Sequence, residues 1–178
     1  MAYNPFAPSS LNKLTKFTKL QRLSLTGKNL KDLNGLSKLT NLVALHIWFL
    51  HLADFSVFTP TNFPKLVDLA LNDSRPTEAD MMSLAKMVNL TRLNLRVSKL
   101  TDAHIKHLTA LTKLGSLEIS YNQITDITAL SGLTQLTFLT LKENQIRDLS
   151  PLVQSTATFG SMIELRTNPL NNTAYTTH

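Results

Sequence analysis

The sequence contains no cysteine, only five glycines and a single tryptophan. Without cysteine the chain can form neither a disulfide framework nor a thiolate metal site, and this absence leaves the cellular compartment open. The five glycines form no glycine-rich phosphate-binding loop. No stretch approaches the roughly 20 apolar residues that a membrane-spanning helix needs, so we expect no insertion into a membrane.

A repeated pattern dominates what is present. Between Leu111 and Leu152 two copies of one register follow each other, and the apolar residues and asparagine of the first copy return 22 residues later. The matched pairs are Leu114 and Leu136, Leu117 and Leu139, Ile119 and Leu141, Asn122 and Asn144, and Ile124 and Ile146. Read outward, the register predicts seven copies that start at Leu20, Leu42, Leu66, Leu90, Leu114, Leu136 and, degenerately, Gly160.

This register of leucines followed by asparagine and isoleucine is the signature of a leucine-rich repeat. The chain resembles a leucine-rich repeat protein, with repeats similar to the internalin-like and phosphatase-regulator-like kinds. The resemblance covers roughly residues 11–170. It implies an α/β fold, a right-handed leucine-rich repeat solenoid with a parallel sheet on the concave face and short helices or 3-10 turns on the convex face.

The sequence also predicts how the chain is divided. Residues 1–19 are expected to cap the first repeat, with Leu11, Leu14 and Phe17 covering the open end of the stack. Residues 20–170 form the repeat domain. Residues 171–178 are a C-terminal tail, and this ending favours the interpretation that the chain is a piece of a longer protein.

Within each copy two apolar residues flank one polar residue, the alternation of a short strand with one buried face. The turn after the strand has an asparagine at Asn122, Asn144 and Asn168, whose amide can satisfy unpaired backbone groups. Ser74 and Ser98 stand there in two earlier copies. Lys28 and Leu50 stand there in the first two, and Leu50 predicts an altered turn in the second repeat.

The backs of the repeats are expected to differ. The longer copies predict helices, one beginning with a capping box from Thr77 to Asp80 and one capped by Thr101 or Asp102. The shorter copies predict 3-10 or irregular turns, with Ser150 as a cap before Pro151. Phe55, Phe58 and Phe63 indicate a bulkier and less helical back in between.

The net charge of +6 invites a nucleic-acid interpretation that the placement of the charges opposes. On the predicted concave face five cations stand against five anions: Arg22, Arg92, Arg96, Lys142 and Arg166 against Asp68, Asp73, Glu118, Glu143 and Glu164. The excess positive charge falls on caps and backs, where it makes no groove that follows phosphates. We expect no nucleic-acid binding.

The second repeat places unusual side chains on the predicted concave face. His46, Trp48 and Phe49 stand where a merely soluble sheet has polar residues, and exposed aromatic groups with polar neighbours are typical of protein-binding sites. The alternative is that Trp48 or Phe49 folds over its own turn into the core. A second contact zone runs through Arg92, Arg96, Glu118, Tyr121, Phe138 and Lys142, with an ordinary solvated face as its alternative. The predicted partner-binding residues are Arg22, His46, Trp48, Phe49, Asn72, Arg92, Arg96 and Tyr121.

The sequence predicts neither catalysis nor a cofactor. His104 and His107 have a spacing that can hold a metal, but only Asp102 offers itself as a further ligand, so we expect solvated histidines. No nucleophile has a histidine and an acid at comparable positions on adjacent strands.

The leading hypothesis is a non-catalytic, monomeric module that binds another protein on its concave face. The alternatives are a structural spacer or surface domain of a larger protein, and carbohydrate binding through Trp48. The resemblance implies a bacterial secreted, surface or effector protein more than a cytoplasmic one, although eukaryotic intracellular regulators have similar repeats and the localisation stays open.

Overall fold

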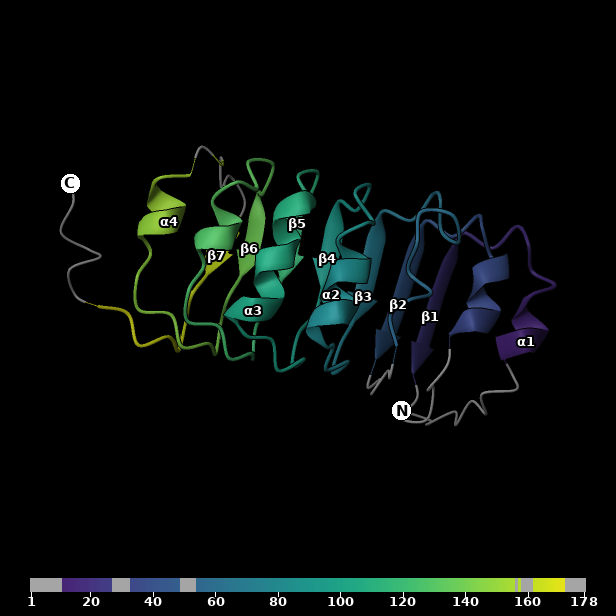
Figure 1. Cartoon of the computed structure of the whole chain (residues 1–178), viewed down its shortest axis with the longest axis horizontal. Helices are drawn as coiled ribbons and strands as arrows, with labels where there is room; N and C mark the ends of the chain where they lie inside the picture. The colour runs from purple at the N-terminus through teal and green to yellow at the C-terminus, as the bar shows by residue number, and fades with distance from the viewer. Residues whose placement is uncertain (1–10, 27–32, 49–53, 156, 158–161, 172–178) are drawn as a thin grey trace.

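The computed structural model describes residues 11–26, 33–48, 54–155, 157 and 162–171. Within these ranges the strands are β1 (Arg22–Thr26), β2 (Ala44–Trp48), β3 (Asp68–Leu71), β4 (Arg92–Asn94), β5 (Ser116–Glu118), β6 (Phe138–Thr140) and β7 (Met162–Glu164). They form one sheet in chain order, and every neighbouring pair is parallel. Figure 1 shows them following one another along the long axis of the molecule.

The register of this sheet is the register of the sequence repeat. The first apolar position of each strand pairs with its counterpart in the next: Leu23, Leu45, Leu69, Leu93, Leu117, Leu139 and Ile163. The five from Leu45 to Leu139 are buried, whereas Leu23 is partly buried and Ile163, on the last strand, is 37% exposed. Successive residues of a strand point to opposite faces, so the side chains at this position from β1 to β6 pack into one continuous core while their neighbours face outward. The predicted leucine-rich repeat solenoid is confirmed.

The other side of the core is covered by short helices. They are α1 (Leu11–Leu14), η2 (Asn34–Lys38), α2 (Glu78–Leu84), α3 (Asp102–Ile105), η3 (Lys106–Ala110), η4 (Thr128–Leu130) and α4 (Ser150–Val153). In Figure 1 these elements form a second layer beside the sheet. No helix in the described ranges is long and apolar enough to cross a bilayer.

The repeats that begin at Leu66 and Leu90 have helical backs, as predicted. In α2 the hydroxyl oxygen of Thr77 accepts from the Asp80 backbone N–H, and the Asp80 carboxylate accepts from the Thr77 backbone N–H at 2.8 Å. This reciprocal capping satisfies two N–H groups that the first helical turn leaves unpaired. The second carboxylate oxygen of Asp80 accepts from the Phe55 N–H at 2.9 Å, which joins α2 to the preceding repeat.

An aspartate lies two residues before the start of η4 and of α4. This corrects the prediction that Ser150 is the cap, because Ser150 is the first residue of α4 and Leu149 precedes it. The Asp148 carboxylate accepts from the Ser150 backbone N–H at 2.8 Å and from its hydroxyl at 2.7 Å. Asp126 binds Thr128 in the same way. The capping oxygen comes from the aspartate because a carboxylate two residues earlier reaches both donors at once.

The aromatic back between β2 and β3 is buried and lacks a helix in its described part, residues 54–66. Phe55, Phe58 and Phe63 are each at most 1% exposed, and the rings of Phe55 and Phe58 meet edge to face at 5.5 Å. Three large rings fill the space that a helix fills in α2 and α3. The prediction of a bulkier segment is confirmed.

At the N-terminal end of the stack Leu11 is 1% exposed and belongs to the core. Leu14 is partly buried against the same core. Phe17, which was expected beside them, is 58% exposed and does not cover the stack. Residues 1–10 of the predicted cap and residues 172–178 of the predicted tail lie outside the described ranges.

The turn after β5 is held by Asn122, as the sequence predicts. Its amide oxygen accepts from the backbone N–H groups of Ser98 and Leu100, both at 3.0 Å. Its amide nitrogen donates to the carbonyl oxygens of Leu95 and Ile119 at 3.1 and 2.8 Å. One buried amide therefore joins two repeats and satisfies four backbone groups.

Asn144 and Asn168 make equivalent contacts one and two repeats further on. Their oxygens accept from the N–H groups of Ile124 and Ile146, each at 3.1 Å. Their nitrogens both donate to the carbonyl of Leu141, each at 2.9 Å. The three residues form an asparagine ladder along the C-terminal half of the stack.

Serine at the same position makes fewer and longer contacts. The hydroxyls of Ser74 and Ser98 lie 3.2 Å apart, and the Ser98 hydroxyl lies 3.4 and 3.3 Å from the carbonyl oxygens of Leu71 and Arg96. A hydroxyl has one proton, so it serves only one of these acceptors at a time. The turns predicted around Lys28 and Leu50 lie outside the described residues.

In the turns of Ser98, Asn122, Asn144 and Asn168, the preceding residue lies in the left-handed region of φ. Val97, Tyr121, Glu143 and Thr167 have φ between 55° and 62°. Residues other than glycine and asparagine adopt this region of φ at a cost in conformational free energy. This left-handed residue places one side chain per repeat at the edge of the concave face.

Candidate functional site

The concave face consists of the outward-pointing side chains of β1 to β7 and of the residues just after them. Large and small side chains are mixed on it, and the small ones are covered by their neighbours. Ala44, Ala70, Ser120 and Thr140 are each at most 5% exposed. The surface is therefore hollowed wherever small residues stand on adjacent strands.

Trp48 lies at the C-terminal end of β2, in register with Thr26 of β1. Its side chain is 39% exposed, so it is not the core residue that the alternative interpretation required. Tryptophan is enriched among the residues that carry most of the binding energy at protein interfaces, so an exposed indole is a candidate anchor. Phe49, predicted beside it, lies outside the described residues.

His46, Asp68 and Arg92 meet across β2, β3 and β4. The Nε2 atom of His46 lies 3.0 Å from one carboxylate oxygen of Asp68, and Nε of Arg92 donates to the other oxygen at 3.1 Å. The Asp68 side chain is the least exposed of the three, at 16%. The carboxylate therefore links two of the predicted site residues into one network.

Asn72 lies inside the stack rather than on the surface. It is 7% exposed, and its side-chain oxygen accepts from the Arg96 backbone N–H at 3.3 Å. Its amide nitrogen has no hydrogen-bond partner among the described residues. With so little exposed surface, the side chain supports the turn after β4 and offers a partner almost nothing. Arg22, at the start of β1, is exposed.

Arg96, Tyr121 and Lys142 form what we call the tyrosine cluster. The Arg96 guanidinium carbon lies 4.5 Å from the centre of the Tyr121 ring, and the Lys142 ammonium lies 5.2 Å from it. Cations are attracted to the face of an aromatic ring by its quadrupole. The three residues follow β4, β5 and β6, and the left-handed φ of 59° at Tyr121 turns its ring between the two cations.

The tyrosine cluster changes the acidity of its phenol. The pKa of Tyr121 is lowered from its ordinary value of 10.0, first by the hydrogen bond with Lys142, against a smaller opposing effect of burial. The positive charges of Lys142 and Arg96 act in the same downward direction. Charge near the ring favours the phenolate.

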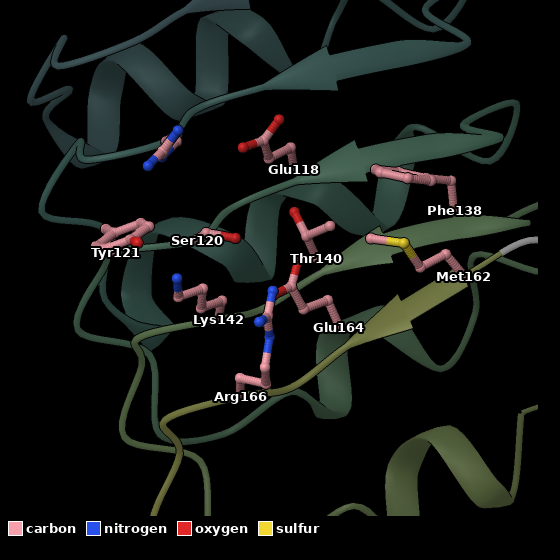
Figure 2. Close-up of a pocket in the computed structure, with 10 residues that line it drawn as sticks. Glu118, Ser120, Tyr121, Phe138, Thr140, Lys142, Met162, Glu164 and Arg166 are labelled. Atoms are coloured by element: carbon pink, nitrogen blue, oxygen red, sulfur yellow. The ribbon is translucent and has the colours of Figure 1, made fainter.

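A cavity of about 260 Å³ opens on the concave face between β4 and β7. Figure 2 shows its lining, with Tyr121 and Lys142 at one end and Phe138 and Met162 at the other. The remaining lining residues are Arg96, Glu118, Ser120, Thr140, Glu164 and Arg166. Five of the six residues in the second contact zone line this cavity, and Arg92 does not.

The carboxylates of the cavity are already engaged. Glu118 accepts from the Asn94 side-chain amide at 2.8 Å. Glu164 accepts from Nε of Arg166 at 2.6 Å and forms an ion pair with the same guanidinium. The buried hydroxyl of Thr140, by contrast, has no hydrogen-bond partner among the described residues.

The two histidines with metal-ligand spacing serve the convex side. The Nδ1 atom of His104 accepts from the Thr101 backbone N–H at 3.1 Å and completes a capping box at α3. The His107 ring lies 3.4 Å from the Glu78 carboxylate, which also pairs with Lys106. Across the described ranges no three His, Cys, Asp or Glu side chains gather as a metal site would require.

Three residues that line the cavity were not among the predicted partner-binding residues: Met162, Glu164 and Arg166. Met162, Glu164 and Arg166 stand one repeat beyond Phe138, Thr140 and Lys142 in the strand register. That register was available in the sequence. The empty space above Ser120 and Thr140 was not, because it depends on how far the neighbouring long side chains extend.

Comparison with known proteins gives the class of protein. Residues 88–146 match the family described as Leucine rich repeat. No curated protein sequence matches the chain. The repeat register, the parallel sheet and this match together show that the chain is built of leucine-rich repeats.

Three solved structures show what the chain is similar to. An internalin from Listeria monocytogenes is 28% identical over 88% of this chain, with a TM-score of 0.69, and internalin C2 from the same organism is 29% identical over 89%, with a TM-score of 0.71. A leucine-rich repeat protein from Leptospira interrogans, 20% identical over 96% of this chain with a TM-score of 0.70, shows the fold alone. The chain spans 44%, 65% and 48% of their respective lengths.

Proposed function

We propose that the chain is a non-catalytic module that binds another protein on its concave face. The observation that supports this proposal best is the cavity between β4 and β7. It brings together, on an open sheet, an aromatic ring, two cations that form no ion pair with any residue the structure describes, and an apolar end. Leucine-rich repeat proteins generally use their extended concave surface to bind other proteins.

Trp48 extends the proposed surface toward the N-terminal half. Its exposed indole lies on β2, and the His46–Asp68–Arg92 network lies between it and the cavity. A partner that contacts both ends would cover β2 to β7, which suits a folded protein or a long extended segment. Likeness to the Listeria internalins favours a bacterial protein of the secreted or surface type.

The proposal is tested by affinity purification from lysates and culture supernatants of the source organism. The wild-type chain is compared with Trp48→Ala and with Arg96→Ala, each checked for an unchanged melting temperature. A partner that the wild type retains and both variants lose supports the concave face as the binding site.

Two matched controls lie on the convex face. Met82→Ala removes an apolar side chain that is 55% exposed on α2, and Lys113→Ala removes a cation that donates to the Asn89 side-chain oxygen at 2.8 Å. If the control variants lose the partner and the concave variants retain it, the binding site lies on the backs of the repeats. A spacer predicts no specific retention, and a carbohydrate-binding chain predicts a sugar ligand that Trp48→Ala loses.

A further inference from the structure

Two cations of the tyrosine cluster lack a carboxylate partner. Within the described residues neither Arg96 nor Lys142 forms an ion pair, whereas Arg92 pairs with Asp68 and Arg166 pairs with Glu164. Both instead lie within about 5 Å of the Tyr121 ring centre. A shared aromatic ring holds the two positive charges at one end of the cavity without neutralising them.

The cavity floor offers a further polar atom. Thr140 is 5% exposed and lines the cavity, yet its hydroxyl oxygen has no hydrogen-bond partner among the described residues. Buried hydroxyl groups are normally paired, so an orphan that lines an open cavity marks a place where a ligand or a water molecule belongs. Figure 2 places Thr140 between the tyrosine cluster and the apolar end.

The charges around the cavity leave a net preference for an anion at one end only. Glu118 and Glu164 are bound by Asn94 and Arg166, while the charges of Arg96 and Lys142 remain available. A polyanion such as nucleic acid would lie close to both glutamates, and their negative charges would repel it. A single carboxylate can bind beside Arg96 and Lys142 without approaching either glutamate.

We propose that the cavity receives an acidic side chain of the protein partner, bound by Arg96 and Lys142 beside Tyr121, while an apolar side chain of the same segment lies against Phe138 and Met162. This inference rests on the proposed function and names the chemistry of the partner. Hydrogen bonds between ionised groups are shorter and stronger than neutral ones, so this contact would dominate the affinity of a short segment.

The spacing of the two ends sets the sequence of the segment. Phe138 and Lys142 are four residues apart along the direction of β6, which corresponds to about 13 Å at the rise of an extended chain. An extended segment that runs parallel to β6 therefore presents the apolar side chain first and the acidic side chain four residues later.

The test is a titration of isotope-labelled protein with the peptide acetyl-Phe-Ala-Ala-Ala-Glu-amide, followed by NMR. We expect the resonances of Arg96, Tyr121, Thr140 and Lys142 to shift, and the affinity to fall as ionic strength rises. The matched peptide with Gln in place of Glu should bind at least about tenfold more weakly, because it lacks the charge. The peptide with Ala in place of Phe tests the apolar end.

Lys142→Gln should weaken binding of the Glu peptide by a similar factor and raise the pKa of Tyr121, and Lys113→Gln on the convex face should leave both unchanged. Equal binding of the Glu and Gln peptides, or no shift at the cavity, would overturn the inference. A partner captured through Trp48 in the purification above would then keep the proposed function standing. Loss of every concave-dependent partner would remove the function itself, whatever the peptide does.

Discussion

The central and C-terminal repeats hold the same turn in two different ways. After β5 the amide of Asn122 satisfies four backbone groups at 2.8 to 3.1 Å, whereas after β4 the hydroxyl of Ser98 makes contacts of 3.2 to 3.4 Å that share one proton. A side-chain amide has two N–H donors and a separate acceptor oxygen in fixed directions, whereas a hydroxyl has one proton, which rotates. The stack therefore concentrates its polar support in the asparagine ladder.

The largest effect is expected from Asn122→Ala. It leaves buried N–H and carbonyl groups of two repeats without partners, and we expect the free energy of unfolding to fall by about 3 kcal/mol. Urea denaturation followed by circular dichroism measures it. The neighbouring Gln123→Ala is the control, because this side chain is exposed. A loss below that of the control would mean that the ladder does not support the fold.

Ser98→Ala should cost less, about 1 kcal/mol, because it removes one hydroxyl with long contacts. The same denaturation experiment checks it, and the ratio of the two losses tests the comparison directly. If Ser98→Ala and Asn122→Ala cost the same, the turn would depend on its shape rather than on its hydrogen bonds.

Asp102 strengthens the junction between the serine and asparagine repeats on the convex side. Its carboxylate accepts from the Thr125 N–H at 2.8 Å, from the Thr125 hydroxyl at 2.5 Å and from the Asp126 N–H at 3.0 Å. Burial raises the pKa of Asp102, but these bonds outweigh it and hold the pKa below its ordinary value of 3.8. Asp102→Asn should cost about 1 kcal/mol at neutral pH.

The pH dependence of this cost follows from the direction of the shift. Because the folded pKa of Asp102 lies below the unfolded one, its contribution is complete above 3.8 and is lost as the pH falls through the lowered folded value. Denaturation of wild type and Asp102→Asn across the acidic range should therefore show a shrinking difference. A constant difference would assign the effect to packing alone.

The smallest effect is a gain from Val97→Asn. Val97 precedes the serine of the weaker turn and has φ of 61°, a conformation that a β-branched side chain adopts at a cost and asparagine tolerates. We expect the free energy of unfolding to rise by about 0.5–1 kcal/mol. A thermal melt beside Val88→Asn, an exposed valine on the convex side, separates relief of backbone strain from removal of surface apolar area. No gain over that control would contradict the strain.

The strands, the asparagine turns and the helical backs were all readable because they recur at a constant spacing. Leu117 and Asn122 return as Leu139 and Asn144, so one interpretation applies to several positions at once. The cap at Ser150 was misplaced because the aspartate motif at Asp126 and Asp148 was overlooked, although it also recurs. Asn72 was expected at the surface because the register alone does not reveal which side chains their neighbours cover.

The binding surface was less predictable from the sequence than the fold. Trp48 was singled out for its rarity, and it is exposed, yet the cavity formed instead in the second contact zone, around Tyr121. In the sequence, Ser120 and Thr140 do not indicate a binding site. They leave room for the cavity because their side chains are short and lie in adjacent repeats between the long side chains of Arg96, Lys142 and Arg166.

The sequence by itself determined the stack: a period of 22 to 24 residues with two apolar positions per strand favours an arrangement in which these repeated positions face one core. Only the tertiary structure decided which outward side chains pair and which remain free. Asp68 joins His46 and Arg92 because three strands align them, and Arg96 and Lys142 meet over Tyr121 because a left-handed turn places its ring there. Periodicity determines which residues face inward, whereas the free charges and hollows of the other face depend on distances between repeats that no single repeat contains.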